Sequence, residues 1–308
     1  MGAASVLTRC SVPGFHTWAS QWVGDACRVV VCESGEEVRT RLCRERPQAL
    51  LIDPLDIEPS EDDVLRVAHQ LYPDLPVALI APSNSGDCFA FLRMYGLGAV
   101  VPPRSNRPPR QMRFFFDHMT APTPASGLGD YFPPGHPIAR RRITSPGMRG
   151  EVFAAMASDL TARGHVDNHD LRLVFEEALN NAVFHAFRTE KNAPKYAGNG
   201  YEAFDEEDVI EVTWAGDNEM SVLAISDNRG FLAPSIVWDR LFRQTSLTGL
   251  LDTSGRGLYL VHLLSRMLLV TIRPGQRTEV SAFFGAGSER EESPISVRVV
   301  PPFAPEEV

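Results

Sequence analysis

Apolar and polar positions follow two different periods along residues 1–120 of the chain. Short apolar runs of the kind found in buried strands alternate with stretches in which apolar residues recur every three or four positions, as in amphipathic helices. Strands are predicted at 5–8, 29–31, 49–52, 77–80 and 99–101, and helices at 36–45, 62–71 and 88–95. This alternation predicts a parallel sheet covered by helices on both faces.

The pattern changes after residue 120. Prolines and glycines crowd between 122 and 137, so 121–142 is interpreted as an extended linker. Helices are predicted at 149–163, 169–187 and 257–266, and strands at 209–214, 220–225, 268–272 and 279–284. Residues 287–308 are rich in Glu, Pro and Ser and are predicted to be disordered. The second domain is therefore placed at 143–286.

Composition narrows the class of protein. The 308 residues carry a formal net charge of −9, which gives no electrostatic argument for a nucleic-acid partner. No apolar stretch is long enough to span a bilayer, and a secretion signal is not expected. The five cysteines form no C-x-x-C pair, so neither a disulfide framework nor a zinc site is expected. We therefore expect a cytoplasmic protein with no membrane partner.

One predicted helix carries a polar stripe. Glu177, Asn181 and His185 are spaced four residues apart, which places them along one helix face. A carboxylate, an amide and an imidazole are costly to bury without partners, so the stripe is either a solvated face or the wall of a cleft. The small apolar residues beside it favour the cleft.

A second motif ends an apolar strand. Asp227 follows the run 222–225, and Gly230 comes soon after it. A carboxylate at a strand end can accept a hydrogen bond from an exocyclic amine such as that of adenine, although the same residues also suit an ordinary turn. Thr278 immediately precedes the last predicted strand and either donates a hydrogen bond to the same carboxylate or its water, or serves as a turn residue.

A third motif precedes an apolar helix. Gly255 and Gly257 flank Arg256 immediately before the helical pattern. Glycine lets a backbone approach a ligand closely, and the N–H groups at a helix start can bind an anion. The alternative is a simple loop and helix start.

The order and spacing of these motifs resemble the GHKL superfamily of ATPases over residues 143–284. Within it, the sequence is most similar to the bacterial anti-sigma-factor serine kinases, whose helix motif has Glu-Ala, Asn and His-Ala, as at 177–178, 181 and 185–186. The resemblance implies an α/β two-layer sandwich with a mixed sheet that binds ATP and Mg²⁺.

The resemblance also implies roles for individual residues. Asn181 coordinates Mg²⁺, Glu177 acts as the general base, and Asp227 reads the adenine amine. The remaining cofactor-binding positions are Gly230, Gly255, Arg256, Gly257 and Thr278. The family pattern Asp-x-Gly-x-Gly departs here, because Arg229 stands at the place of the first glycine or one residue is missing.

The first domain resembles response-regulator receiver domains, which are flavodoxin-like parallel α/β sandwiches. Asp53 falls where the phosphorylated aspartate belongs. Arg9 and Cys10 occupy the place of the acidic pair that holds Mg²⁺, Ala81 replaces a Thr or Ser, and the domain contains no lysine. The domain is therefore interpreted as a pseudo-receiver, a docking or dimerisation module.

The sequence thus predicts an ATP-binding bacterial signal-transduction regulator. The leading hypothesis is a serine/threonine protein kinase of the anti-sigma-factor type, acting on an anti-anti-sigma-like protein or a sigma factor through positioning and charge neutralisation. The alternative is a nucleotide-binding switch that sequesters its partner without catalysis. A third hypothesis is an α/β protein that binds no nucleotide. A homodimer is compatible with the resemblance, since related kinases often pair.

Overall fold

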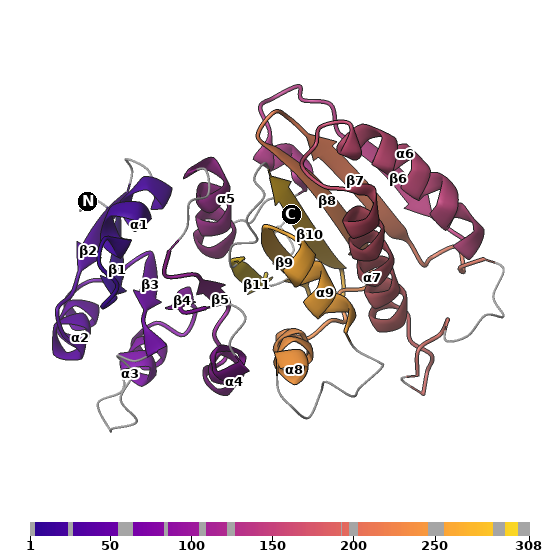
Figure 1. Ribbon diagram of the computed structural model, residues 1–308. Coiled ribbons are helices and arrows are strands. Elements are labelled where there is room, and N and C mark those ends of the chain that lie inside the picture. The colour runs from indigo at the N-terminus through magenta and orange to yellow at the C-terminus, as the bar shows by residue number, and fades with distance from the viewer. Residues whose placement is uncertain are drawn as a thin grey trace, which may run out of the picture. The chain divides into compact units, whose positions relative to one another are not determined.

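The computed structural model describes residues 4–23, 27–54, 64–82, 86–104, 109–121, 127–191, 193–196, 203–245, 256–285 and 293–300. The chain divides into two compact units (Figure 1). The first comprises Met1–Pro124 and Pro294–Ser296, and the second comprises Ala125–Ser293 and Val297–Val308. The fold is α/β, with parallel strand pairs in the first unit and antiparallel pairs in the second.

The first unit is built on parallel strands that run in the order β2-β1-β3-β4-β5. This order is that of the flavodoxin-like doubly wound fold, so the predicted architecture of the first domain is confirmed. Its strands are β1 (Ala4–Arg9), β2 (Cys27–Val31), β3 (Ala49–Ile52), β4 (Val77–Ile80) and β5 (Ala99–Val101). Every residue of β3 and β5 is buried, as expected for strands covered on both faces.

The helices of this unit form two pairs. α1 (Phe15–Val23) packs beside α5 (Pro109–Thr120), and α2 (Gly35–Arg44) packs beside α3 (Val64–Leu71). α4 (Gly86–Tyr95) precedes β5. Neither α1 nor α5 is among the helices predicted from the sequence, although the buried residues of α1 at 15, 19, 22 and 23 have helical spacing.

A strand forms where disorder was expected. β11 (Ile295–Val299) pairs antiparallel with β5 through Ile295 and Ser296, and the Ser296 hydroxyl lies 3.0 Å from Nδ1 of the buried His118. The prediction of disorder for 287–308 is therefore wrong over this strand. Its apolar residues are few, and the Glu- and Pro-rich composition around them concealed the pattern.

The second unit contains an antiparallel arrangement in the order β9-β10-β8-β7-β6. The strands are β6 (Ala139–Ile143), β7 (Ile210–Gly216), β8 (Met220–Asp227), β9 (Met267–Arg273) and β10 (Arg277–Gly285). β6 belongs to the predicted linker, as does the short 3-10 helix η2 (Leu128–Tyr131), whose two end residues are buried. The second unit therefore begins before residue 143, the predicted start.

Helices cover one face of this sheet (Figure 1). α7 (Asn168–Ala186) packs against β8, β10 and α9 (Gly257–Leu264), while α6 (Arg149–Thr161) packs against β7. A second 3-10 helix, η3 (Pro146–Met148), leads into α6, and α8 (Pro234–Thr245) lies beside α9. The second unit is therefore a two-layer α/β arrangement.

The sequence of α7 accounts for its position. Asp167 caps the helix by accepting a hydrogen bond from the backbone N–H of Asp170 at 2.8 Å. Its buried residues 171, 174, 175, 178 and 179 follow the spacing of an amphipathic helix and form the face that packs on the sheet. Among the described residues, no helix is both long and apolar enough to cross a membrane.

We expect truncation of Phe175 to destabilise the protein far more than truncation of Phe184 on the same helix. Phe175 is 0% exposed and its ring centroid lies 5.7 Å from that of Phe153, whereas Phe184 is 45% exposed. Phe175→Ala should lower the free energy of unfolding by about 3–5 kcal/mol and Phe184→Ala by less than about 1 kcal/mol. Urea unfolding followed by circular dichroism measures both, and equal losses would contradict the buried face assigned to α7.

Candidate functional site

Two helices of the second unit meet where the polar stripe was predicted. A Cβ atom added at Gly257, the first residue of α9, would lie 2.5 Å from Oε2 of Glu177 and 2.9 Å from Nδ2 of Asn181. Only a residue without a side chain permits this approach. The structure therefore brings together Glu177, Asn181 and Gly257, which lie far apart in the sequence.

The two polar side chains on α7 differ in how they are held. Asn181 donates its Nδ2 to the backbone carbonyl of Glu177 at 2.9 Å, and within the described residues its Oδ1 accepts no hydrogen bond. Burial raises the pKa of Glu177, and the neighbouring charge of Glu176 raises it further. The site thus offers an amide oxygen and a carboxylate that is more basic than usual.

The start of α9 faces these residues, and among the residues that the structure describes its N-cap residue supplies no side-chain cap. Arg256 precedes the helix, is exposed, and provides no capping hydrogen bond. The backbone N–H groups of a first turn that lacks a cap can bind an anion. Gly255, which was also predicted to belong to the site, lies outside the described residues.

The Asp227 turn, residues 227–230, supplies a second polar group. Oδ1 of Asp227 accepts hydrogen bonds from the backbone N–H of Arg229 at 2.8 Å and of Gly230 at 2.9 Å. Asp227 is only 6% exposed, and burial raises its pKa against the opposing effect of these backbone bonds. Thr278 stands directly across from it on β10, and its hydroxyl is buried with no partner of full hydrogen-bond geometry among the described residues.

The register places this carboxyl group on the helix-covered face of the sheet. Trp214 on β7 donates its indole N–H to Asp159 of α6 at 2.8 Å, so its side chain lies on the helix side. Leu223 pairs with Trp214, and Asp227 follows Leu223 at an even spacing along β8. Side chains two and four residues apart share one face of a strand, so Asp227 and its partner Thr278 point toward the helix layer that carries Glu177.

The backbone conformation at residue 230 and the close contact with Arg273 both require a glycine. It has a φ of +65°, and an added Cβ would lie 2.0 Å from the backbone carbonyl oxygen of Arg273. The Asp227 turn therefore sits directly on the hairpin between β9 and β10. A glycine was predicted here to approach a ligand, whereas its closest neighbour in the structure is the chain itself.

His185 completes the stripe on α7 and is mostly buried. Arg188 approaches its Nδ1 at 3.5 Å. Burial lowers the pKa of His185 to about 4, with further contributions from the charges of Arg240 and Arg188. The imidazole is therefore neutral at neutral pH. Sequence spacing placed His185 on the stripe but gave no signal for Arg240, which comes from α8.

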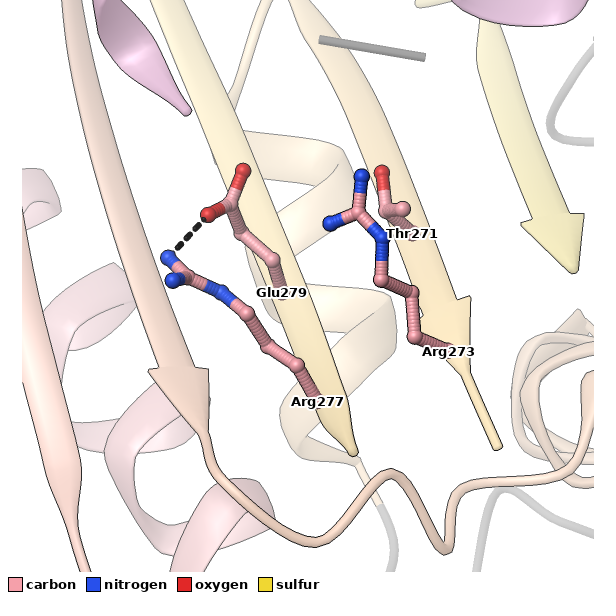
Figure 2. Close-up of a pocket in the computed structure, with 4 residues that line it drawn as sticks. All are labelled: Thr271, Arg273, Arg277 and Glu279. Atoms are coloured by element: carbon pink, nitrogen blue, oxygen red, sulfur yellow. Dashed lines mark hydrogen bonds and ion pairs between the residues drawn. The ribbon is translucent and has the colours of Figure 1, made fainter. Parts of the chain in front are cut away.

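The opposite face of the sheet carries a charged pocket (Figure 2). It is lined by Thr271, Arg273, Arg277 and Glu279. Arg277 bonds Glu279 at 2.6 Å and lies 3.8 Å from Glu211 on β7. Because side chains alternate along β10, this pocket and Thr278 are on different faces, so the pocket is separate from the residues predicted for the cofactor.

In the first unit, Asp53 directly follows β3 and is buried. It accepts a hydrogen bond from the Ser11 hydroxyl at 3.1 Å. The guanidinium of Arg9 donates to the backbone carbonyl of Glu33 at 2.7 Å, and Ala81 is buried after β4. Within the described residues, no group of three or more His, Cys, Asp and Glu could hold a metal ion.

Comparison with models of known protein families finds no match, and comparison with curated proteins finds none. Among solved structures, the chain is similar to a beryllofluoride-activated NtrC receiver domain, with 21% identity, coverage of 34% of this chain and 86% of that one, and a TM-score of 0.26.

Two further solved structures are similar at the same level. A CheY-like receiver domain protein from Methanospirillum hungatei JF-1 has 15% identity, coverage of 36% and 88%, and a TM-score of 0.28. A transiently phosphorylated "switch" in bacterial signal transduction has 22% identity, coverage of 39% and 94%, and a TM-score of 0.29. The fold assignment of the first unit rests on its own strand order.

We expect Gly230→Ala to destabilise the protein more than Gly275→Ala. Both glycines have a positive φ, of +65° and +72°, but only Gly230 has a backbone atom where the new Cβ would go. The strain of a left-handed alanine is common to both, so the difference, at least about 2 kcal/mol in the free energy of unfolding, measures the contact with Arg273. Similar losses in urea unfolding would show that the contact is not tight.

We expect His185 to make stability depend on pH. Its pKa is about 4 in the folded protein against 6.5 for the ordinary group, so the unfolded chain binds a proton that the folded chain does not. Its contribution is therefore fully present above about pH 6.5 and is lost as the pH falls toward 4, by up to about 3 kcal/mol. His185→Gln should flatten this part of the curve of unfolding free energy against pH, and an unchanged slope would contradict the assignment.

Proposed function

We propose that the second unit binds Mg-ATP and transfers its γ-phosphoryl group to a serine or threonine of a partner protein, in the manner of an anti-sigma-factor kinase. The observation that carries the proposal is the convergence of Glu177 and Asn181 on Gly257 at the uncapped start of α9. Anion-binding N–H groups, an available amide oxygen and a carboxylate are the groups that such a reaction needs.

The residues present fit a magnesium-bound triphosphate. Asn181 offers Oδ1 as a ligand for a hard cation, because its Nδ2 is already engaged by the Glu177 carbonyl. The absence of a side chain at Gly257 lets the Glu177 carboxylate and the Asn181 amide lie beside the first turn of α9, whose backbone N–H groups suit phosphate oxygens. Mg²⁺ bound there would neutralise the charge of the phosphates.

Glu177 is suited to accept the proton of the attacking hydroxyl. As the bond from that oxygen to the γ-phosphorus forms, the bond from phosphorus to the oxygen of the leaving ADP breaks, and the hydroxyl proton passes to the Glu177 carboxylate. Partial burial makes this carboxylate a better base than an exposed one. Asp227 lies on the helix-covered face of the sheet, toward the layer that carries Glu177, and is suited to accept a hydrogen bond from the adenine amine.

The first unit is proposed to act as a docking or dimerisation module of a signal-transduction regulator. Its flavodoxin-like strand order and the buried Asp53 are those of a receiver, while Arg9 and Cys10 stand where an acidic pair would hold Mg²⁺. The partner of the second unit is proposed to be an anti-anti-sigma-like protein or a sigma factor.

One observation favours a second candidate function, a nucleotide-binding switch that sequesters its partner without catalysis. Arg229 stands at a glycine position and is tied by its side chain to Asp208. A rigid base-binding turn supports tight nucleotide binding without requiring that phosphoryl transfer follow. Labelling of a partner protein by ATP separates the two candidates, because only the kinase leaves phosphate on the partner.

We expect Mg-ATP binding to depend on Asn181 but not on Asn180, its neighbour on α7. Asn180 accepts a hydrogen bond from Arg149 at 2.9 Å, away from Gly257. In isothermal titration, Asn181→Ala should weaken binding at least about tenfold and Asn180→Ala should leave it unchanged. Glu177→Gln should retain binding and slow transfer by about 10²–10⁴-fold. Absence of Mg-ATP binding to the wild type, or equal binding by both asparagine variants, would overturn the proposal.

A further inference from the structure

Asp208, just before β7, is the centre of a charged cluster in the second unit. Its side chain is only 2% exposed and accepts hydrogen bonds from Arg229, from Lys195 at 2.7 Å and from the Tyr196 hydroxyl at 2.7 Å. Burial alone would raise the pKa of Asp208, but the bonds from Lys195 and Arg229 outweigh it and lower the pKa. Asp208 is therefore a buried, ionised and fully partnered carboxylate.

Arg229 links this cluster to the Asp227 turn. Its guanidinium contacts Oδ1 of Asp208 through both Nε, at 3.0 Å, and Nη2. Its backbone N–H donates to Oδ1 of Asp227 at 2.8 Å. The same residue therefore holds the carboxyl group of Asp227 through its main chain and is itself held through its side chain.

The neighbours of Arg229 are fixed by other partners. Asn228 accepts a hydrogen bond from the backbone of Val209 at 3.0 Å and donates to the carbonyl of Glu207 at 2.7 Å. Gly230 lies against the Arg273 carbonyl. Three consecutive residues of the turn thus have three separate anchors. Arg229 and Gly230 both donate a backbone N–H to Asp227, and Arg229 is the one that is held by an ion pair.

We propose that the Asp208–Arg229 ion pair is a positioning device that fixes the Asp227 carboxylate for recognition of a purine base carrying an exocyclic amine. The inference rests on the proposed function and assigns base specificity within it. The two backbone bonds from the turn engage Oδ1, and Thr278 on β10 also interacts with this carboxyl group. Each carboxylate oxygen has two lone pairs, so Asp227 can still accept an N–H from the base. A carboxylate held in this way loses little freedom on binding and rejects a base that presents a carbonyl oxygen.

The specificity can be measured with two nucleotides that differ only at the C6–N1 edge of the base. ATP carries an amine at C6 and an unprotonated N1, whereas inosine triphosphate carries a carbonyl oxygen at C6 and a proton on N1; the ribose and the triphosphate are the same. At pH 8, the wild type should bind Mg-ATP at least about tenfold more tightly than Mg-inosine triphosphate in isothermal titration. Phosphate binding at α9 contributes equally to both, so their ratio reports the base alone.

Lys195 provides the matched control, because it pairs with the same Asp208 carboxylate but has no bond to the turn. Arg229→Gln should reduce the preference for Mg-ATP by at least about fivefold while changing the affinity for Mg-inosine triphosphate by less than about twofold. Lys195→Gln should keep the wild-type ratio. A merely structural role for the cluster would instead affect both variants and both nucleotides alike.

Each remaining outcome bears on the inference. An Arg229→Gln ratio equal to that of the wild type, or an equal loss in Lys195→Gln, would overturn it while leaving the proposed function standing. A wild type that binds neither nucleotide would overturn the proposed function and the inference with it. A wild type that binds both equally would overturn the inference and leave the proposed function standing. If Arg229→Gln fails to fold, Arg229→Lys keeps the charge but not the two-nitrogen contact and should give an intermediate ratio.

Discussion

The close approach of α9 to α7 at Gly257 is the constraint on which the candidate site depends. With any side chain at this position, the Glu177 carboxylate and the Asn181 amide would have to move away from the first turn of α9. The approach places a helix start that the Arg256 side chain does not cap beside a stripe of α7 that carries a carboxylate and an amide. An anion there would meet the first-turn N–H groups of α9 and a cation ligand on α7 together, which neither helix offers alone.

The Asp227 turn meets a different physical demand. Burying a carboxylate is unfavourable, and here two backbone N–H groups offset the cost at one oxygen while the turn itself is anchored from three sides. Neither the Gly230 contact with Arg273 nor the Asp208 ion pair touches the site directly. Both fix the backbone from which Asp227 projects, so the preorganisation of this carboxyl group lies in residues one layer away.

The two faces of the second unit's sheet carry different sets of polar and charged side chains. The helix-covered face carries Asp227 and Thr278, whereas the other carries the ionic contacts of Arg277 with Glu279 and Glu211. Strict alternation along β10 produces this division. A different reason explains why β6 was interpreted as a linker. An edge strand pairs through its backbone, and the exposed arginines of β6, such as Arg140 beside Glu211, give no apolar pattern in the sequence.

The sequence by itself determined the strands of the first unit, the long helices of the second, and the stripe of Glu177 and Asn181, because each depends on a short period within one element. It did not determine which elements meet. Only the tertiary structure placed Gly257 against that stripe and showed that Arg229, apparently a departure from a glycine motif, is bound to a buried Asp208. Periodicity records which face of an element is apolar, whereas the partner of a charged or glycine position is set by contacts between segments distant in the chain.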